Sequence, residues 1–174
     1  MPDPTVIGRV VSVHAGALRT LLHAGRELAS GIFKTVLAGG APVGVAGLEG
    51  DCQGDSHHHG GPGRALCVYP REHLVWLAGR VGEELGTAPC GENLSTESLL
   101  EPDHAIGDCC WIGSAIFEIS APRNPCHRLA ARHGVPDLPV DLERSGRTSL
   151  FFRVLAPGWF TAGDEVVRLE QPFP

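Results

Sequence analysis

Glycine and proline interrupt this chain along its whole length, and this feature limits its fold more than any other. There are 23 glycines and 14 prolines among 174 residues. Both residue types break regular helices and favour turns, so short strands joined by turns suit the sequence better than a bundle of long helices. The length suits one domain, which we take to span residues 1–174.

Short apolar segments bounded by turn residues predict several strands. The clearest is residues 5–14, and an alternating segment follows the turn at Gly113–Ser114. Further strands are expected over residues 32–36, 43–45, 64–69, 147–155 and 164–169, and just before that turn. We therefore predict a mostly-β barrel or sandwich with two or three helices packed outside.

Two helices are predicted from apolar spacing and capping residues. The first begins at Pro70 and ends at Gly86. Its apolar face would carry Leu74, Leu77, Ala78, Val81 and Leu85. The second carries Cys126 and ends at Gly134, a residue suited to the left-handed conformation of a helix C-cap.

Cys126 is the residue for which the sequence most clearly predicts chemistry. Asn124 is a good N-cap and Pro125 suits the first helical position, which would put Cys126 in the first turn. Positive charge would surround it from Arg123, His127 and Arg128. Such surroundings stabilise a thiolate, which is both a nucleophile and a ligand for soft metals.

Net charge and cysteine usage exclude several functional classes. A net charge of −6 without a basic stripe argues against nucleic-acid binding. No signal peptide is recognisable, and no run approaches the about 18 apolar residues of a membrane span. The six cysteines lack the spacing of a disulfide scaffold or a zinc knuckle, so we expect reduced thiols in a cytoplasmic protein.

The loop over residues 47–63 is rich in Gly, Asp and His, and a loop of this length in a compact domain is usually functional. Adjacent histidines 57–59 cannot all face one ion, which disfavours zinc. We expect His59 to hydrogen-bond a cofactor or substrate, while Gly60 and Gly61 let backbone N–H groups approach an anion.

Lys34 is the one lysine beside 13 arginines, and its compact ammonium could bind a phosphate. A pyridoxal-phosphate enzyme would depend entirely on Lys34, and no pyridoxal-binding pattern surrounds it, so pyridoxal phosphate is disfavoured. Arg147 could bind an anion or simply pair with Glu143, and Glu92–Asn93 could be a turn or part of a site.

Taken together, these segments resemble the MOSC family, which is named for the C-terminal domain of molybdenum cofactor sulfurases. The resemblance is closest to small stand-alone bacterial members associated with resistance to N-hydroxylated purine analogues. It rests on motifs that occur in the family's order: 47–51, Asp55, 58–62, 65–69, 91–94, 106–108, 123–126, 145–148 and 152–155.

The resemblance implies a β-barrel that binds the pterin-based molybdenum cofactor. Its cysteine, which matches Cys126, would ligate molybdenum or carry sulfur. Arg123 would pair with the cofactor phosphate through its planar fork. The remaining cofactor contacts would come from Lys34, Asp55, His59, Gly60, Gly61, Glu92, Asn93 and Arg147.

The leading functional hypothesis is a molybdenum-dependent reductase of N-hydroxylated compounds, such as hydroxylamino-purines. A separate reductase would supply electrons, because the chain has neither a flavin motif nor an iron–sulfur cysteine pattern. One alternative is a carrier that holds sulfur or cofactor on Cys126. Another is a non-molybdenum metalloprotein that uses His57, His59 and either Asp51 or Asp55.

Overall fold

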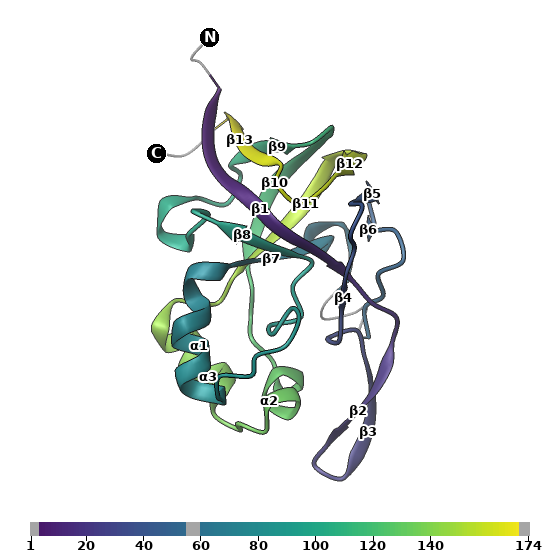
Figure 1. The fold of residues 1–174 in the computed structure, drawn as a ribbon, viewed down its shortest axis with the longest axis vertical. Coiled ribbons are helices and arrows are strands. Elements are labelled where there is room, and N and C mark those ends of the chain that lie inside the picture. Colours follow the sequence, from purple (N-terminus) through teal and green to yellow (C-terminus); the bar gives the residue numbers. More distant parts are fainter. Residues whose placement is uncertain (1–3, 55–59, 171–174) are drawn as a thin grey trace.

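The computed structural model describes residues 4–54 and 60–170, and its main feature is a closed barrel of seven strands (Figure 1). The strand order is β13-β9-β10-β11-β7-β8-β1, and β1 pairs with β13 to close it. Only β7 and β8 run parallel within this barrel. The strands are β1 (Thr5–Ala15), β7 (Leu66–Pro70), β8 (Leu94–Glu97), β9 (Cys109–Ile112), β10 (Ala115–Pro122), β11 (Leu150–Ala156) and β13 (Glu165–Glu170). The prediction of a mostly-β fold is confirmed, in its barrel form.

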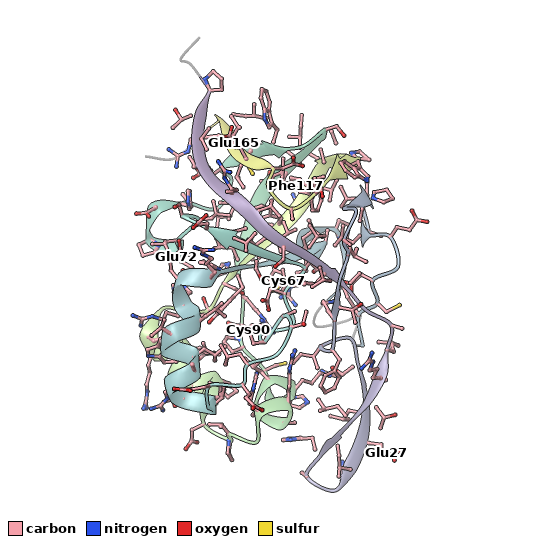
Figure 2. All side chains as sticks on the ribbon, viewed as in Figure 1. Glu27, Cys67, Glu72, Cys90, Phe117 and Glu165 are labelled. Carbon is pink, nitrogen blue, oxygen red and sulfur yellow. The ribbon has the colours of Figure 1, made fainter. Side chains whose placement is uncertain are left out.

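Alternating side chains fill the barrel. Along β10, every second residue from Ala115 to Ile119 is buried, which is the period expected of a strand with one face toward a core. Phe117 lies among the barrel strands, with its ring centroid 5.7 Å from that of Phe152 and 5.8 Å from that of Phe160 (Figure 2). These aromatic contacts pack the part of the barrel interior that lies away from the helices.

The other elements surround this barrel. The strands are a hairpin of β2 (Arg19–His23) and β3 (Arg26–Ser30), a short β4 (Thr35–Val36) beside β1, and a small sheet of β5 (Ala41–Gly44), β6 (Gly47–Leu48) and β12 (Gly158–Phe160). The helices are α1 (Leu74–Val81), α2 (His127–His133) and α3 (Leu138–Ser145). Short 3-10 turns lie at Pro62–Arg64, Arg71–His73 and Glu101–Asp103. The three α-helices agree with the two or three that were predicted.

The helices pack together at one end of the barrel, and the β2–β3 hairpin extends beside α2 (Figure 1). A second apolar cluster joins them to the barrel. Its fully buried members include Tyr69 at the end of β7, Leu77 of α1, Leu129 of α2 and Leu138 of α3. This cluster places the start of α2 close to the barrel strands.

The predicted first helix is shorter than its apolar spacing suggests. A 3-10 turn occupies its beginning, α1 starts at Leu74, and Gly82 ends it with a φ of 101° rather than Gly86. Leu85 still packs against the second apolar cluster from outside the helix. The periodicity therefore identified the packing of Leu85 correctly but assigned this partly buried residue to the wrong backbone conformation.

Two predicted strands are also shorter than expected. Of residues 32–36 only Thr35 and Val36 pair with β1, because the preceding residues turn to line a pocket. Of residues 147–155, pairing begins at Leu150, and Arg147 lies in the connection from α3. The β2–β3 hairpin and α3 were not predicted. In the described ranges, no helix combines the length and apolarity that crossing a membrane would require.

Candidate functional site

A pocket opens where the β3–β4 connection, the 51–54 loop and the segment before α2 meet. Its volume is about 600 Å³ when the open mouth is included. The described residues that line it are Ser30, Gly31, Ile32, Lys34, Asp51, Cys52, Gln53, Gly54, Arg64, Cys67, Gly91, Asn93, Arg123, Cys126, Arg128 and Phe151. Residues far apart in the sequence therefore meet in one site.

The pocket is positively charged although the chain as a whole is negative. The described part of its lining includes four cationic side chains and one carboxylate, whereas the whole chain has a net charge of −6. The cations are Lys34, Arg64, Arg123 and Arg128, and the carboxylate is that of Asp51. A concave surface of one sign raises the local concentration of ligands of the opposite sign. The chemistry of the lining therefore favours an anionic ligand.

Cys126 lies in the pocket, as the residue just before α2 rather than in the first helical turn that the sequence predicts. It is the N-cap of α2, with an extended backbone at φ −125° and ψ 170°, and the helix begins at His127. The extended backbone of Cys126 itself keeps this residue out of the first helical turn. The predicted end at Gly134 is confirmed, with Gly134 in the left-handed conformation.

Arg123 supplies the positive charge beside the pocket thiols. Burial acts to lower the pKa of its guanidinium, but the sulfur atoms of Cys67, Cys90 and Cys126 outweigh that effect, so its pKa is raised. Its backbone N–H donates to the carbonyl of Ser149 at 3.0 Å. The guanidinium thus stays charged, and the backbone of Arg123 is tied to the residue just before β11.

The three thiols around Arg123 differ in their surroundings. Cys67 of β7 lines the pocket, and its sulfur lies 3.6 Å from the hydroxyl of Ser149. Cys90 lies behind it, between the barrel and the helices (Figure 2). Burial raises the pKa of Cys90 to about 12, so this thiol stays protonated near neutral pH. None of the six cysteines, all of which are described, forms a disulfide.

Lys34 lines the pocket in a buried ion pair with Asp51. Its ammonium lies 2.5 Å from Oδ1 of Asp51, and the two side chains are 5% and 7% exposed. The other oxygen of Asp51 accepts a hydrogen bond from Nδ2 of Asn93 at 2.8 Å. An Asp51 saturated in this way is poorly suited to ligate a metal, the role that one sequence hypothesis gave to either Asp51 or Asp55. The described residues contain no cluster of three metal-ligating side chains.

Glu92 and Asn93 are both buried but have different surroundings. Asn93 lines the pocket, donates to the carbonyl of His14 at 3.2 Å and accepts from the backbone of Cys67 at 3.0 Å. Glu92 lies outside the described lining, where its carboxylate accepts from the N–H of Cys90 and the hydroxyl of Ser95, both at 3.0 Å. Burial raises the pKa of Glu92. This residue braces the turn that carries Asn93.

The remaining predicted site residues are not part of the described lining. Gly60 and Gly61 precede the 3-10 turn at Pro62–Arg64 without lining the pocket. Arg147 places its guanidinium 5.6 Å from the ring of Trp76, on the side of α1. Asp55 and His59 lie outside the described residues, as does His57.

Several pocket residues were missed by sequence reasoning. Arg64 and Phe151 both line the pocket, with the guanidinium 5.7 Å from the ring centroid. Gln53 donates to the carbonyl of Arg64 at 3.0 Å and so fixes the loop beside them. These residues come from separate strands and loops, and no local spacing in the sequence relates them. The pairing of β7 with β11 and the hydrogen bond of Gln53 bring them together.

Comparison with known proteins places this geometry in a family. The MOSC domain matches residues 55–167. YflK of Bacillus subtilis is 35% identical over 162 residues, which cover 93% of this chain and 73% of that protein. A protein of Gibberella moniliformis named as a reductase is 32% identical over 177 residues, covering 99% of this chain and 31% of that protein.

A solved structure gives the same answer for the fold. The crystal structure of YiiM from Geobacillus stearothermophilus has a TM-score of 0.77 and 32% identity, covering 94% of this chain and 75% of the other. The domain match extends over most of the barrel strands and includes Arg123 and Cys126. From its sequence, its barrel and the segment that carries its pocket cysteine, this chain belongs to the MOSC domain family.

Proposed function

We propose that this protein binds the molybdenum cofactor in its pocket, with Cys126 as the thiolate ligand, and that it reduces N-hydroxylated compounds. MOSC domains are associated with this cofactor. The observation that carries the proposal is that Cys126 shares one pocket with four cationic side chains. A thiolate suits a soft metal, and the cations suit a phosphate.

The residues present fit the chemical groups of this cofactor. Its phosphate is an anion that Lys34 can contact as a point charge and Arg123 as a planar fork. The ring of Phe151 under the guanidinium of Arg64 offers a flat surface for a pterin. Cys90, held protonated by burial, does not compete with Cys126 as a thiolate.

Each pocket residue then has a distinct role in the reaction. When bound, the cofactor supplies a metal centre that exchanges two electrons. Cys126 would hold that centre, and Arg123 would stabilise the negative charge of the thiolate. Asn93 keeps the adjoining backbone in place through its bonds to Cys67 and His14. The open mouth admits a small substrate.

Electrons would come from a separate reductase. Reduction of an N–OH group to N–H consumes two electrons and two protons and releases water. The sequence contains neither a flavin motif nor an iron–sulfur pattern that could supply those electrons. In support, the Gibberella protein named as a reductase contains a region similar to nearly this whole chain within a protein about three times as long.

The test is turnover of a hydroxylamino-purine by protein produced in a cofactor-competent host, with a chemical reductant in place of the partner. The wild-type protein should form the amino-purine, and Cys126→Ser should not. Molybdenum-loaded protein that left every N-hydroxylated substrate unchanged would contradict the reductase proposal. Transfer of sulfane sulfur from Cys126 to an acceptor in that case would support the carrier function instead.

A further inference from the structure

Asp51 is a carboxylate in the wall of a pocket whose other charged side chains, among the described residues, are cationic. A carboxylate at that position repels an anionic ligand, so the proposed function alone gives no reason for it. Its side chain is only 7% exposed, which rules out a solvated surface charge. A buried charge in a ligand pocket requires a partner and a physical explanation.

Every oxygen of Asp51 is occupied by a donor from another segment of the chain. Oδ1 accepts from the ammonium of Lys34 at 2.5 Å and from the backbone N–H of Gly16 at 3.0 Å. Oδ2 accepts from Nδ2 of Asn93 at 2.8 Å. The carboxylate therefore joins the end of β1, the β3–β4 connection and the turn before β8.

The backbones around this junction pack too closely for ordinary side chains. A Cβ on Gly16 would lie 2.3 Å from the carbonyl oxygen of Phe33, and one on Gly31 would lie 1.9 Å from that of Cys52. The N–H of Cys52 also donates to the carbonyl of Gly16 at 3.0 Å. The loop that carries Asp51 is thus held against the segment that carries Lys34, which gives the pair a fixed geometry.

The ammonium of Lys34 keeps N–H donors that can bind a ligand. An ammonium has three N–H donors, and the bond to Asp51 accounts for one. The side chain is only 5% exposed and lines the pocket. A lysine stem is flexible, so an ammonium presents its donors in one direction only when something holds it.

We propose that Asp51 is a positioning residue, which holds the Lys34 ammonium so that its remaining donors face a phosphate-type anion in the pocket. The inference rests on the proposed function, because it assigns the anionic part of the ligand to this wall. It concerns anion binding alone, so its test uses cofactor-free protein and inorganic pyrophosphate. The presence of molybdenum and the turnover of substrate do not enter that test.

A double-mutant cycle at Asp51 and Lys34 separates a positioning role of Asp51 from a purely electrostatic effect. Asp51→Asn makes the pocket more positive by one charge, so electrostatics alone would strengthen pyrophosphate binding. Positioning predicts the opposite, a loss of about tenfold in affinity measured by calorimetry, similar to that of Lys34→Gln. The double variant should bind no more weakly than Lys34→Gln alone. Stronger binding by Asp51→Asn, or losses that add in the double variant, would overturn the proposal.

The single lysine allows a direct spectroscopic test. Because Lys34 is the only lysine in 174 residues, protein labelled with ¹⁵N at lysine Nζ gives one assignable ammonium signal. We expect a slowly exchanging signal that shifts when pyrophosphate is added, and loss of that shift in Asp51→Asn. If Asp51 only stabilised the fold, folded Asp51→Asn would show the same shift as the wild-type protein. That result, or no shift in the wild-type protein, would overturn the proposal.

A charge-conserving variant covers the case in which Asp51→Asn does not fold. Lys34→Arg keeps both charges of the pair but changes how the donors are presented. We expect it to bind pyrophosphate about tenfold more weakly than the wild-type protein. Wild-type affinity in Lys34→Arg would overturn the proposal, and so would the absence of any pyrophosphate binding by folded wild-type protein.

Discussion

Ser149 holds a backbone conformation that serine rarely adopts, with a φ of 85° at a fully buried position. Its N–H donates to the carboxylate of Glu101 at 2.8 Å, and its carbonyl accepts from the N–H of Arg123. Its hydroxyl contacts the sulfur of Cys67. Strain of this kind persists only where several contacts enforce it, and here those contacts reach two pocket residues.

Two substitutions separate this strain from the contact of the hydroxyl. Ser149→Ala and Ser149→Gly both remove the hydroxyl, but only glycine adopts a positive φ without strain. We expect Ser149→Gly to be more stable than Ser149→Ala by about 1 kcal/mol, measured as the free energy of unfolding in urea. Equal stability of the two variants would show that the backbone at this position is not strained.

Arg123→Lys should weaken cofactor retention, because lysine keeps the charge but loses the planar fork that suits a phosphate. The measurement is oxidised pterin per protein after purification, and we expect roughly a several-fold loss. Arg147→Lys is the matched control, since Arg147 packs on Trp76 away from the pocket. Equal losses in both variants, or none in Arg123→Lys, would remove Arg123 from the site.

Sequence reasoning found part of the pocket at this scale. The structure brings together Lys34, Asn93, Arg123 and Cys126, all of which were predicted. Their residue types are unusual in their local context, and that made them recognisable. The role of Asp51 was not predicted, because it depends on donors from three distant segments that only the folded chain brings into contact.

At the scale of elements, α2 is attached to the pocket wall through its last turn. The guanidinium of Arg132 donates to the carbonyls of Ile32 at 2.7 Å, Ala88 at 2.6 Å and Thr87 at 2.8 Å. It also lies 5.3 Å from the ring centroid of Phe33. One helical residue thus fixes both the β3–β4 connection and the loop that leads to Asn93.

Arg132→Met should lower the free energy of unfolding by about 2 to 4 kcal/mol, because three carbonyls lose a charged donor and two loops lose their attachment. Urea denaturation measures the effect. Arg144→Met on the exposed side of α3 is the control and should change stability by less than about 0.5 kcal/mol. Similar effects from the two substitutions would contradict the attachment inferred for Arg132.

The sequence predicted elements best where a local signal agreed with tertiary packing. The turn at Gly113–Ser114 and the end of α2 at Gly134 were of this kind. The β2–β3 hairpin was missed because Ala24 and Gly25 form its turn, both with positive φ, and alanine is an uncommon residue there. The first helix was predicted too long because Leu85 is partly buried without being helical.

For the whole molecule, buried histidines link stability to pH. Burial is the main cause that lowers the pKa values of His14, His104 and His133. Their unfolded forms, with pKa values near the ordinary 6.5, therefore bind protons before the folded forms do. The contribution of these histidines to the free energy of unfolding should therefore be fully present above about pH 6.5 and should be lost as the pH falls below that value.

Glu92 has the opposite effect on the free energy of unfolding. Because its pKa is raised, the folded state keeps a proton on this carboxyl at pH values above 4.5, where the unfolded chain has lost it. The unfolded histidines take up protons between pH 7.5 and pH 5.5, so we expect the urea midpoint to be lower at pH 5.5 than at pH 7.5. An unchanged or higher midpoint at pH 5.5 would show that the buried histidines do not control the stability of the fold in this range.

Closure of the barrel was the whole-molecule property that local patterns could not predict. Strand periodicity allows both a barrel and a sandwich, because each strand buries one face in either case. The pairing of β1 with β13 joins residues near the two ends of the chain. The pairing of β11 with β7 places Phe151 opposite Cys67, with Arg64 just before β7, and no local sequence motif relates these pocket residues.

The central claim is that Cys126 holds the metal of a molybdenum cofactor in this pocket. The most direct test measures molybdenum and oxidised pterin in folded wild-type protein and in Cys126→Ser, both produced in a cofactor-competent host. We predict near-stoichiometric molybdenum and pterin in the wild-type protein, and loss of molybdenum in a variant with an unchanged fold. Equal molybdenum in the two proteins, or none in folded wild-type protein, would contradict the claim.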